Sequence, residues 1–149
     1  MKILVAKDAG YCFGVRDAVN LAQKSGEEYE SVFMLGDIVH NEDVVDDLNK
    51  SGSVVVNNLD EIPEDKPVLF RAHGTDPKIW KDAQKKKLNI IDATCPLVTE
   101  IHKEIKILES EGRRTIIIGD HNHDEVEGIA AQVSKPIVIS SVKEARALG

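Results

Sequence analysis

The sequence is poor in cysteine, basic charge and long apolar runs, and each shortage excludes a class of protein. Its two cysteines stand far apart in no CxxC pair, so they cannot form the disulfide framework of a small secreted domain. Basic residues number 19 against 26 acidic ones, and the net charge of −7 argues against nucleic acid or an anionic membrane as partner. No apolar run approaches the roughly 20 residues of a membrane span. The N-terminal apolar stretch is too short for a signal peptide, so we expect a cytoplasmic protein.

What the sequence does contain is a repeated alternation of short apolar runs and amphipathic stretches. We predict strands at residues 2–6, 32–35, 54–56, 68–70, 89–91, 115–118 and 137–139. We predict helices at residues 15–28, 42–50, 77–86, 96–110, 125–132 and 142–148. The polar stretch 57–67 is a predicted loop with a single helical turn. This alternation is typical of an α/β protein built from strand–loop–helix units with mainly parallel sheets.

The chain divides best near residue 95, where "DATCPLV" leads into a long predicted helix. We predict that residues 1–95 form one complete α/β domain. Residues 96–149 contain two predicted strands, which is too few for an independent α/β domain. We therefore predict that they form part of a second domain.

Reactive side chains recur in the loops that follow the predicted strands. In open parallel sheets, ligands bind at this edge, where helix N-termini also point. Both cysteines and every histidine except His102 lie in such loops: Cys12, His40, His73, Cys95, His121 and His123. Any one of them alone is explained as a buried thiol or a surface or capping imidazole. Their recurrence at one edge of one kind of unit favours a functional site.

The chemistry of these residues leaves more than one function open. Cys95 precedes Pro96 at a predicted helix start, where the helix dipole favours a thiolate, and thiolates suit iron–sulfur clusters or zinc. Several histidines near helix N-termini suit a phosphorylated anion, and an adjacent glutamate could supply a proton. One hypothesis is an iron–sulfur reductase acting on a phosphorylated substrate. Another is a zinc hydrolase with Cys/His ligands, although CxxC and HExxH spacings are absent.

Five motifs resemble one enzyme family in order and spacing. "AGYCFGV", "LGDIVHN", "FRAHG", "DATCPLV" and "HDEVEG" are similar to segments of the 4-hydroxy-3-methylbut-2-enyl diphosphate reductases, the LytB family. The resemblance begins at residue 2 and runs essentially to the end of the chain. It implies a reductase of the methylerythritol phosphate route that forms isopentenyl and dimethylallyl diphosphate.

The resemblance also implies roles for individual residues. Cys12 and Cys95 would be ligands of a [4Fe–4S] cluster, which the family holds with three cysteines. His40, His73 and His123 would bind the diphosphate of the substrate. Glu125 would take part in proton delivery. An electron donor such as ferredoxin or flavodoxin would be the redox partner, with no nucleic acid and no membrane.

Two departures from the family pattern bear on activity. Asp124 stands where the family usually has proline, and we expect Asp124 to cap the following helix instead. The third cluster cysteine is absent from this chain, so we expect a truncated portion that is inactive by itself. The alternative is a non-catalytic phosphate-binding module whose affinity rises as the pH falls through about 6.5, where imidazole protonates.

Overall fold

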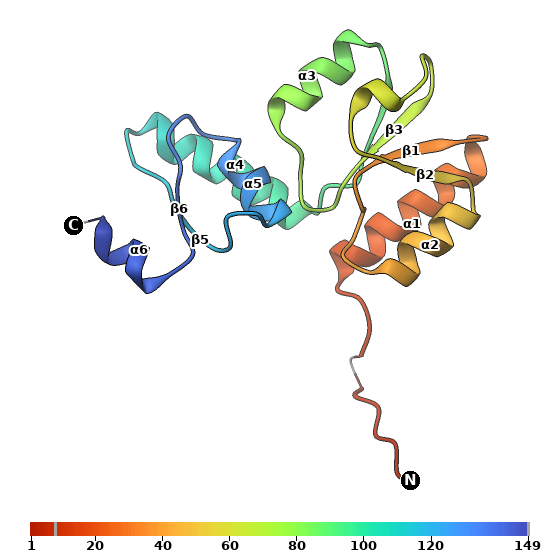
Figure 1. Cartoon of the computed structure of the whole chain (residues 1–149), viewed down its shortest axis with the longest axis horizontal. Coiled ribbons are helices and arrows are strands. Elements are labelled where there is room, and N and C mark those ends of the chain that lie inside the picture. Colours follow the sequence, from red (N-terminus) through yellow and green to blue (C-terminus); the bar gives the residue numbers. More distant parts are fainter. Residues whose placement is uncertain (8, 149) are drawn as a thin grey trace.

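The structure is a computed structural model that describes residues 1–7 and 9–148. In the described chain, the first unit is a four-stranded parallel sheet in the order β2–β1–β3–β4 (Figure 1). Its strands are β1 (Val32–Leu35), β2 (Ser53–Val56), β3 (Pro67–Phe70) and β4 (Asn89–Asp92). Strands that alternate with helices and pair in parallel confirm the predicted α/β class.

Helices cover both faces of this sheet because its central strands are apolar on both sides. The covering elements are α1 (Phe13–Glu28), α2 (Glu42–Lys50), the 3₁₀ helix η1 (Leu59–Glu61) and α3 (Pro77–Lys85). Leu69 of β3 faces the core that α1 and α2 cover, whereas its neighbours Val68 and Phe70 face the α3 side. This alternation follows from the two-residue period of a strand. Burying a side chain such as Phe70 stabilises the fold by about 1.5–3 kcal/mol.

The second unit has a smaller and more exposed sheet. It consists of α4 (Pro96–Ser110), β5 (Ile116–Ile118), α5 (Asp124–Ala130), β6 (Ile137–Ile139) and α6 (Val142–Ala147). Strands β5 and β6 pair in parallel. The side chain of Ile118 is 86% exposed, whereas Val68 in β3 is fully buried. The division of the chain into one complete and one partial domain stays a prediction.

A close contact between α5 and the loop after β3 joins the two units. A β-carbon added at Gly128 would lie 3.0 Å from the backbone oxygen of His73, so the helix approaches this closely because residue 128 has no side chain. Just beyond α5, the amide of Gln132 donates to the backbone oxygen of Thr75 at 3.4 Å. Gly128 belongs to the "HDEVEG" motif, and packing against His73 explains why that motif ends in glycine.

The strand predicted at residues 2–6 is wrong. Residues 1–7 extend away from both sheets without regular secondary structure (Figure 1), and Ile3, Leu4 and Val5 are 74–81% exposed. A strand needs a neighbouring backbone to satisfy its N–H and C=O groups, and no described residue pairs with this segment. The apolar pattern of these residues predicts a strand, but the strand does not form because no neighbouring backbone pairs with it.

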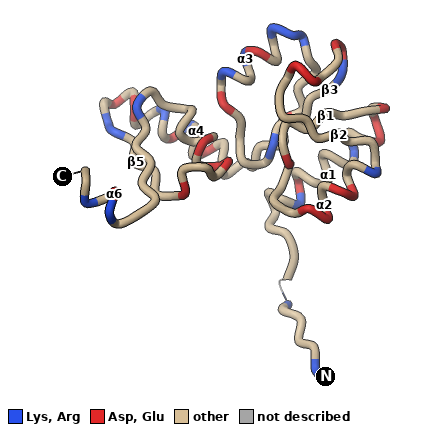
Figure 2. The backbone as a smooth tube through the Cα atoms, in the orientation of Figure 1, with Lys and Arg blue, Asp and Glu red and all other residues tan. Residues whose placement is uncertain are grey.

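Charged side chains are mixed in sign over most helices of both units. Acidic and basic positions occur together along α1, α3, α4 and α6, whereas α2 is mostly acidic and α5 carries acidic charges alone (Figure 2). Residues 1–7 carry their side-chain charges at Lys2 and Lys7, with apolar residues between. Among the residues that the structure describes, no helix has the length and apolar character needed to cross a membrane.

Candidate functional site

Three histidines converge from three different loops at the carboxyl ends of strands. His40 precedes α2, His73 follows β3, and His123 directly precedes α5. The rings of His40 and His73 stack with centroids 4.3 Å apart, and the ring of His123 lies 5.4 Å from His40 and 6.3 Å from His73. We call these residues, together with Arg71 and Asp124, the histidine group. His40 and Arg71–His73 follow β1 and β3 of the four-stranded sheet, whereas His123 and Asp124 follow β5 of the second sheet. The contact between the two units therefore completes the group.

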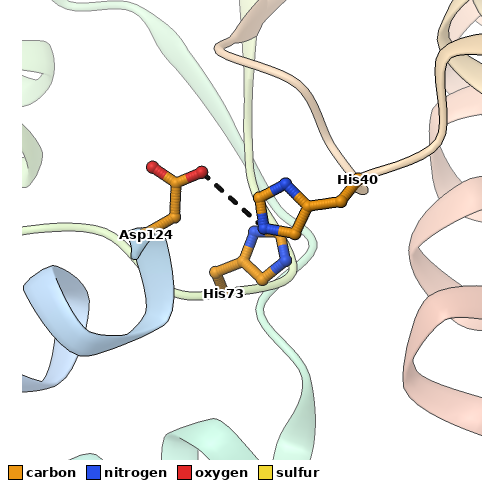
Figure 3. A group of neighbouring side chains, drawn as sticks. All are labelled: His40, His73 and Asp124. Atoms are coloured by element: carbon orange, nitrogen blue, oxygen red, sulfur yellow. Dashed lines mark ion pairs between the residues drawn. The ribbon is translucent and has the colours of Figure 1, made fainter. Parts of the chain in front are cut away.

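Arg71 and Asp124 complete this group through an ion pair. Arg71 Nη1 lies 2.7 Å from Asp124 Oδ1, and both side chains are half-buried. The second carboxylate oxygen of Asp124 lies 3.9 Å from His40 Nε2 (Figure 3). Arg71 was not among the predicted site residues, although it is the first residue after β3 in the "FRAHG" motif. Its pairing across the two units is a tertiary contact that no local pattern encodes.

The cap of α5 differs from the prediction. His123, not Asp124, is the N-cap: its Nδ1 accepts a hydrogen bond from the backbone N–H of Glu125 at 3.2 Å. Asp124 occupies the first helical position, which frees its carboxylate to pair with Arg71. The capping bond requires an unprotonated Nδ1, so the neutral ring carries its proton on Nε2, which can donate to an anion.

Burial determines the protonation of His73. Removal from water, assisted by the neighbouring His40 ring, lowers the pKa of His73 from 6.5 to about 4. Asp124 opposes this shift, whereas Arg71 adds to it. His73 is therefore neutral in the free protein at pH 6.5, and it cannot provide the pH response near that value that the sequence analysis expected of the histidines.

Glu125 lies at the second position of α5, beside the histidine group. Its backbone N–H donates a hydrogen bond to His123 Nδ1, but its carboxylate makes no hydrogen bond to any described residue. The structure thus brings Glu125 close to the group along the chain without fixing its carboxylate. Its role in proton delivery stays a prediction.

Both cysteines are N-cap residues of long helices. Cys12 precedes α1, which begins two residues earlier than predicted, and Cys95 precedes α4. Neither side chain makes a capping hydrogen bond within the described part of the chain, although this position favours Ser, Thr, Asp or Asn. A β-carbon added at Gly14, in the first turn of α1, would lie 2.6 Å from Cys95 Sγ. The starts of α1 and α4 therefore meet, and we call Cys12 and Cys95 the cysteine pair.

The cysteine pair fits two ligands of an iron–sulfur centre. Soft thiolates near helix N-termini are suitable ligands for such a centre, and the absent side chain at Gly14 leaves room for Cys95. Within residues 1–7 and 9–148, the Cys/His ligand set of the zinc hydrolase hypothesis is not assembled. Among the described residues, the group with potential metal ligands within 4.8 Å of one another is His40, His73 and Asp124, without either cysteine.

The two remaining histidines lie outside this group. His121 Nε2 lies 2.9 Å from a carboxylate oxygen of Glu144 in α6. The backbone N–H of Ser140 and the His121 ring lower the pKa of Glu144 to about 2. His102 is half-buried in α4 and lines a separate cavity of about 390 Å³. His121 and His102 therefore lie in separate environments, away from the three converging rings.

A larger cavity of about 790 Å³ borders the ion pair. Arg71, Asp124 and Glu127 contribute to its wall, with residues of α3 and the loop before η1. Among the described residues that line it, there is none of the three converging histidines and neither cysteine. The reactive side chains therefore lie beside this cavity rather than inside it, and Arg71 and Asp124 are shared.

Comparison with known proteins identifies the family. The LytB protein family model matches residues 3–149. A 4-hydroxy-3-methylbut-2-enyl diphosphate reductase of Wolbachia pipientis wMel is 41% identical over 143 residues, covering 93% of this chain and 46% of that protein. The Nitrosomonas europaea reductase of the same name is 39% identical over 136 residues, covering 91% of this chain and 42% of the relative.

Solved structures agree with these relatives. The E-1-hydroxy-2-methyl-but-2-enyl-4-diphosphate reductase of Plasmodium falciparum superposes with a TM-score of 0.92 at 31% identity, covering 96% of this chain and 46% of its own. A second structure, described as the terminal enzyme of the non-mevalonate pathway, gives 0.82 at 36% identity. The chain spans about half the length of the proteins that it matches. With a family model that covers almost all of its residues, the chain belongs to the LytB protein family.

Proposed function

We propose that this chain supplies the diphosphate-binding histidines and two cluster ligands of a 4-hydroxy-3-methylbut-2-enyl diphosphate reductase. The observation that carries this proposal is the convergence of three imidazoles beside Arg71. It is supported by two N-cap cysteines that make no capping hydrogen bond and stand where the starts of α1 and α4 meet. The LytB family is known to use a [4Fe–4S] cluster, and the relatives carry the name of this reductase.

Each residue has a defined task in this proposal. His40, His73 and His123 bind the diphosphate, with His123 donating from Nε2 because its Nδ1 caps α5. Cys12 and Cys95 hold the cluster through their thiolates. When bound, the cluster would supply electrons for replacing the C–O bond of the substrate hydroxyl by a C–H bond, a change that consumes two electrons and two protons and releases water. Glu125, next to the histidine group, delivers a proton.

The redox chemistry requires a partner that this chain does not contain. Two electrons reach the cluster from a one-electron carrier of the ferredoxin or flavodoxin kind. The substrate is a small diphosphate ester and thus a multiply charged anion, and we propose that the reaction takes place in the cytoplasm. The products are isopentenyl and dimethylallyl diphosphate.

The experiment is anaerobic reconstitution, with iron and sulfide, of this chain within a protein of the full length of its relatives. We expect a brown protein that converts hydroxymethylbutenyl diphosphate with a chemical or protein reductant. The variants Cys12→Ser and Cys95→Ser should lose iron and activity, because each removes a thiolate. A colourless protein that takes up zinc in place of iron, with no reductase activity, would contradict the proposal.

A second function is favoured by one observation: the histidine group is assembled within the chain, whereas the cysteine pair offers only two ligands. The chain by itself would then be a phosphate-binding module without catalysis. Diphosphate binding by the iron-free chain, together with no reductase activity in the reconstituted full-length protein, would favour this function over cluster chemistry.

A further inference from the structure

The histidine group contains one carboxylate, Asp124, among its imidazoles. Asp124 uses Oδ1 for Arg71 and directs Oδ2 towards His40 Nε2 (Figure 3). The charge of Asp124 balances that of Arg71. Two imidazoles and the carboxylate oxygen that Arg71 does not contact form a donor set for a cation.

We propose that His40, His73 and Asp124 form a binding site for a divalent transition-metal ion, with Zn²⁺ as the best match. One ligand atom from each residue lies within 4.8 Å of the others. Two histidines and one carboxylate, with a remaining position for water, are the ligands of many catalytic zinc centres. The three ligands come from the loop before α2, the loop after β3 and the first turn of α5.

Small side-chain movements are sufficient to bring the ligands to bonding distance. Zinc bonds of this kind imply ligand atoms roughly 3.4 Å apart in a tetrahedron. The side chain of His40 is 52% exposed and can rotate towards Asp124. The ring of His73 is held by its surroundings, and its buried Nδ1 has no hydrogen-bond partner among the described residues. Arg71 fixes Asp124 through the other oxygen, so His40 is the ligand that must move.

The test uses the chain without its thiols, because thiolates bind zinc themselves. Serine at positions 12 and 95 is suited to the helix caps there, so the double variant Cys12→Ser/Cys95→Ser keeps the fold. After treatment with chelator, calorimetric titration with Zn²⁺ should give one ion per chain. In this background, Asp124→Pro should weaken binding by roughly 100-fold, as should His40→Ala. Proline is favoured at the first helical position, so α5 persists.

The matched control is His121→Ala, which removes an imidazole paired with a carboxylate away from the proposed site. This variant should bind Zn²⁺ as the thiol-free parent does. Asp124→Asn keeps the shape of the side chain and should also weaken Zn²⁺ binding. If circular dichroism finds the proline variant unfolded, the asparagine variant tests whether the carboxylate is a ligand. An absence of saturable Zn²⁺ binding in the thiol-free chain would overturn the proposal. Equal affinity in the parent, Asp124→Asn and His40→Ala would do the same.

Discussion

The histidine group and the cysteine pair both lie where strands end and helices begin, yet they differ in completeness. The histidine group draws three imidazoles and an ion pair from three loops and both units. The cysteine pair has two thiols, one from the start of α1 and one from the start of α4. A chain with two cysteines cannot provide a third thiolate.

This difference separates binding from redox chemistry within one chain. Anion binding needs donors and positive helix ends in a fixed arrangement, which loops of the two sheets supply where the units meet. An iron–sulfur cluster needs enough thiolates to hold its irons, which depends on how many cysteines meet. We therefore expect the 149-residue chain to bind a diphosphate without holding a stable cluster.

The largest expected effect concerns the cluster itself. The 149-residue chain, reconstituted with iron and sulfide and then handled in air, should retain no intact cluster and no reductase activity, because two thiolates leave two irons without protein ligands. Iron and sulfide analysis after gel filtration measures this. Three or more irons per chain that survive gel filtration in air would contradict it and would indicate a further ligand or a site shared between chains.

A substitution at Gly14 should damage the cysteine pair and spare the histidine group. The β-carbon of Gly14→Ala would lie 2.6 Å from Cys95 Sγ, so the thiol must move from its place beside α1. In a protein of full family length, iron content after anaerobic reconstitution should fall by more than half. Gly119→Ala is the matched control, since its β-carbon would contact a methyl group of Val126 at 2.7 Å, away from the thiols. Equal iron loss in both variants would show that general overpacking is responsible.

Protonation of His73 should destabilise the fold at acid pH. Its pKa is 6.5 when exposed and about 4 in the fold, so between these values the unfolded chain binds a proton that the folded chain does not. The free energy of unfolding should therefore fall as the pH drops from 6.5 to 4. Because the ring is partly exposed, we expect a loss on the order of 1 kcal/mol.

Urea unfolding of metal-free protein across this pH range measures the effect. The variant His73→Asn should have a flatter pH profile than the parent. His40, His123, Arg71 and Asp124 are the charged or titratable groups near this ring, and they remain in the variant. Identical profiles for parent and variant would mean that His73 titrates normally.

The smallest effect comes from the helix caps. Cys12→Ser and Cys95→Ser should each raise the free energy of unfolding by a few tenths to about 1 kcal/mol, since a serine oxygen can accept a backbone N–H that the thiol leaves without a side-chain partner. Cys→Ala at the same positions is the control and should give no gain. If the serine variants have the same free energy of unfolding as the alanine variants, the cysteines do not lower the stability of these helix starts.

Much of the first unit could be predicted because its signals are local. The runs that became β1 and β3 are apolar, short and bounded by loop residues, and a parallel sheet then places the following loops at one edge. His40 and His73 lie at that edge, in the loops after β1 and β3 where they were predicted. His123 follows β5 of the second sheet, so its position beside them depends on the contact between the units. The single helical turn predicted within residues 57–67 is confirmed as η1, which Asn58 and Glu61 cap through a reciprocal pair of hydrogen bonds.

What could not be predicted depends on contacts between distant segments. Residues 2–6 look like a strand, but pairing requires a neighbour that their composition does not specify. Asp124 looked like a helix cap, yet Arg71 across the unit boundary takes its carboxylate and leaves capping to His123. The early start of α1 was missed because cysteine is a poor capping signal.

The most direct test of the account is whether the 149-residue chain binds diphosphate without any metal. Calorimetric titration with inorganic diphosphate, at pH 6, low salt and in the presence of a chelator, should give saturable one-to-one binding. His40→Ala and His123→Ala should each weaken it by roughly tenfold, because each removes a hydrogen bond to a charged group. His121→Ala should leave it unchanged, since that ring pairs with Glu144 outside the group. No detectable binding, or equal binding in all three variants, would contradict the claim that the histidine group is an assembled anion site.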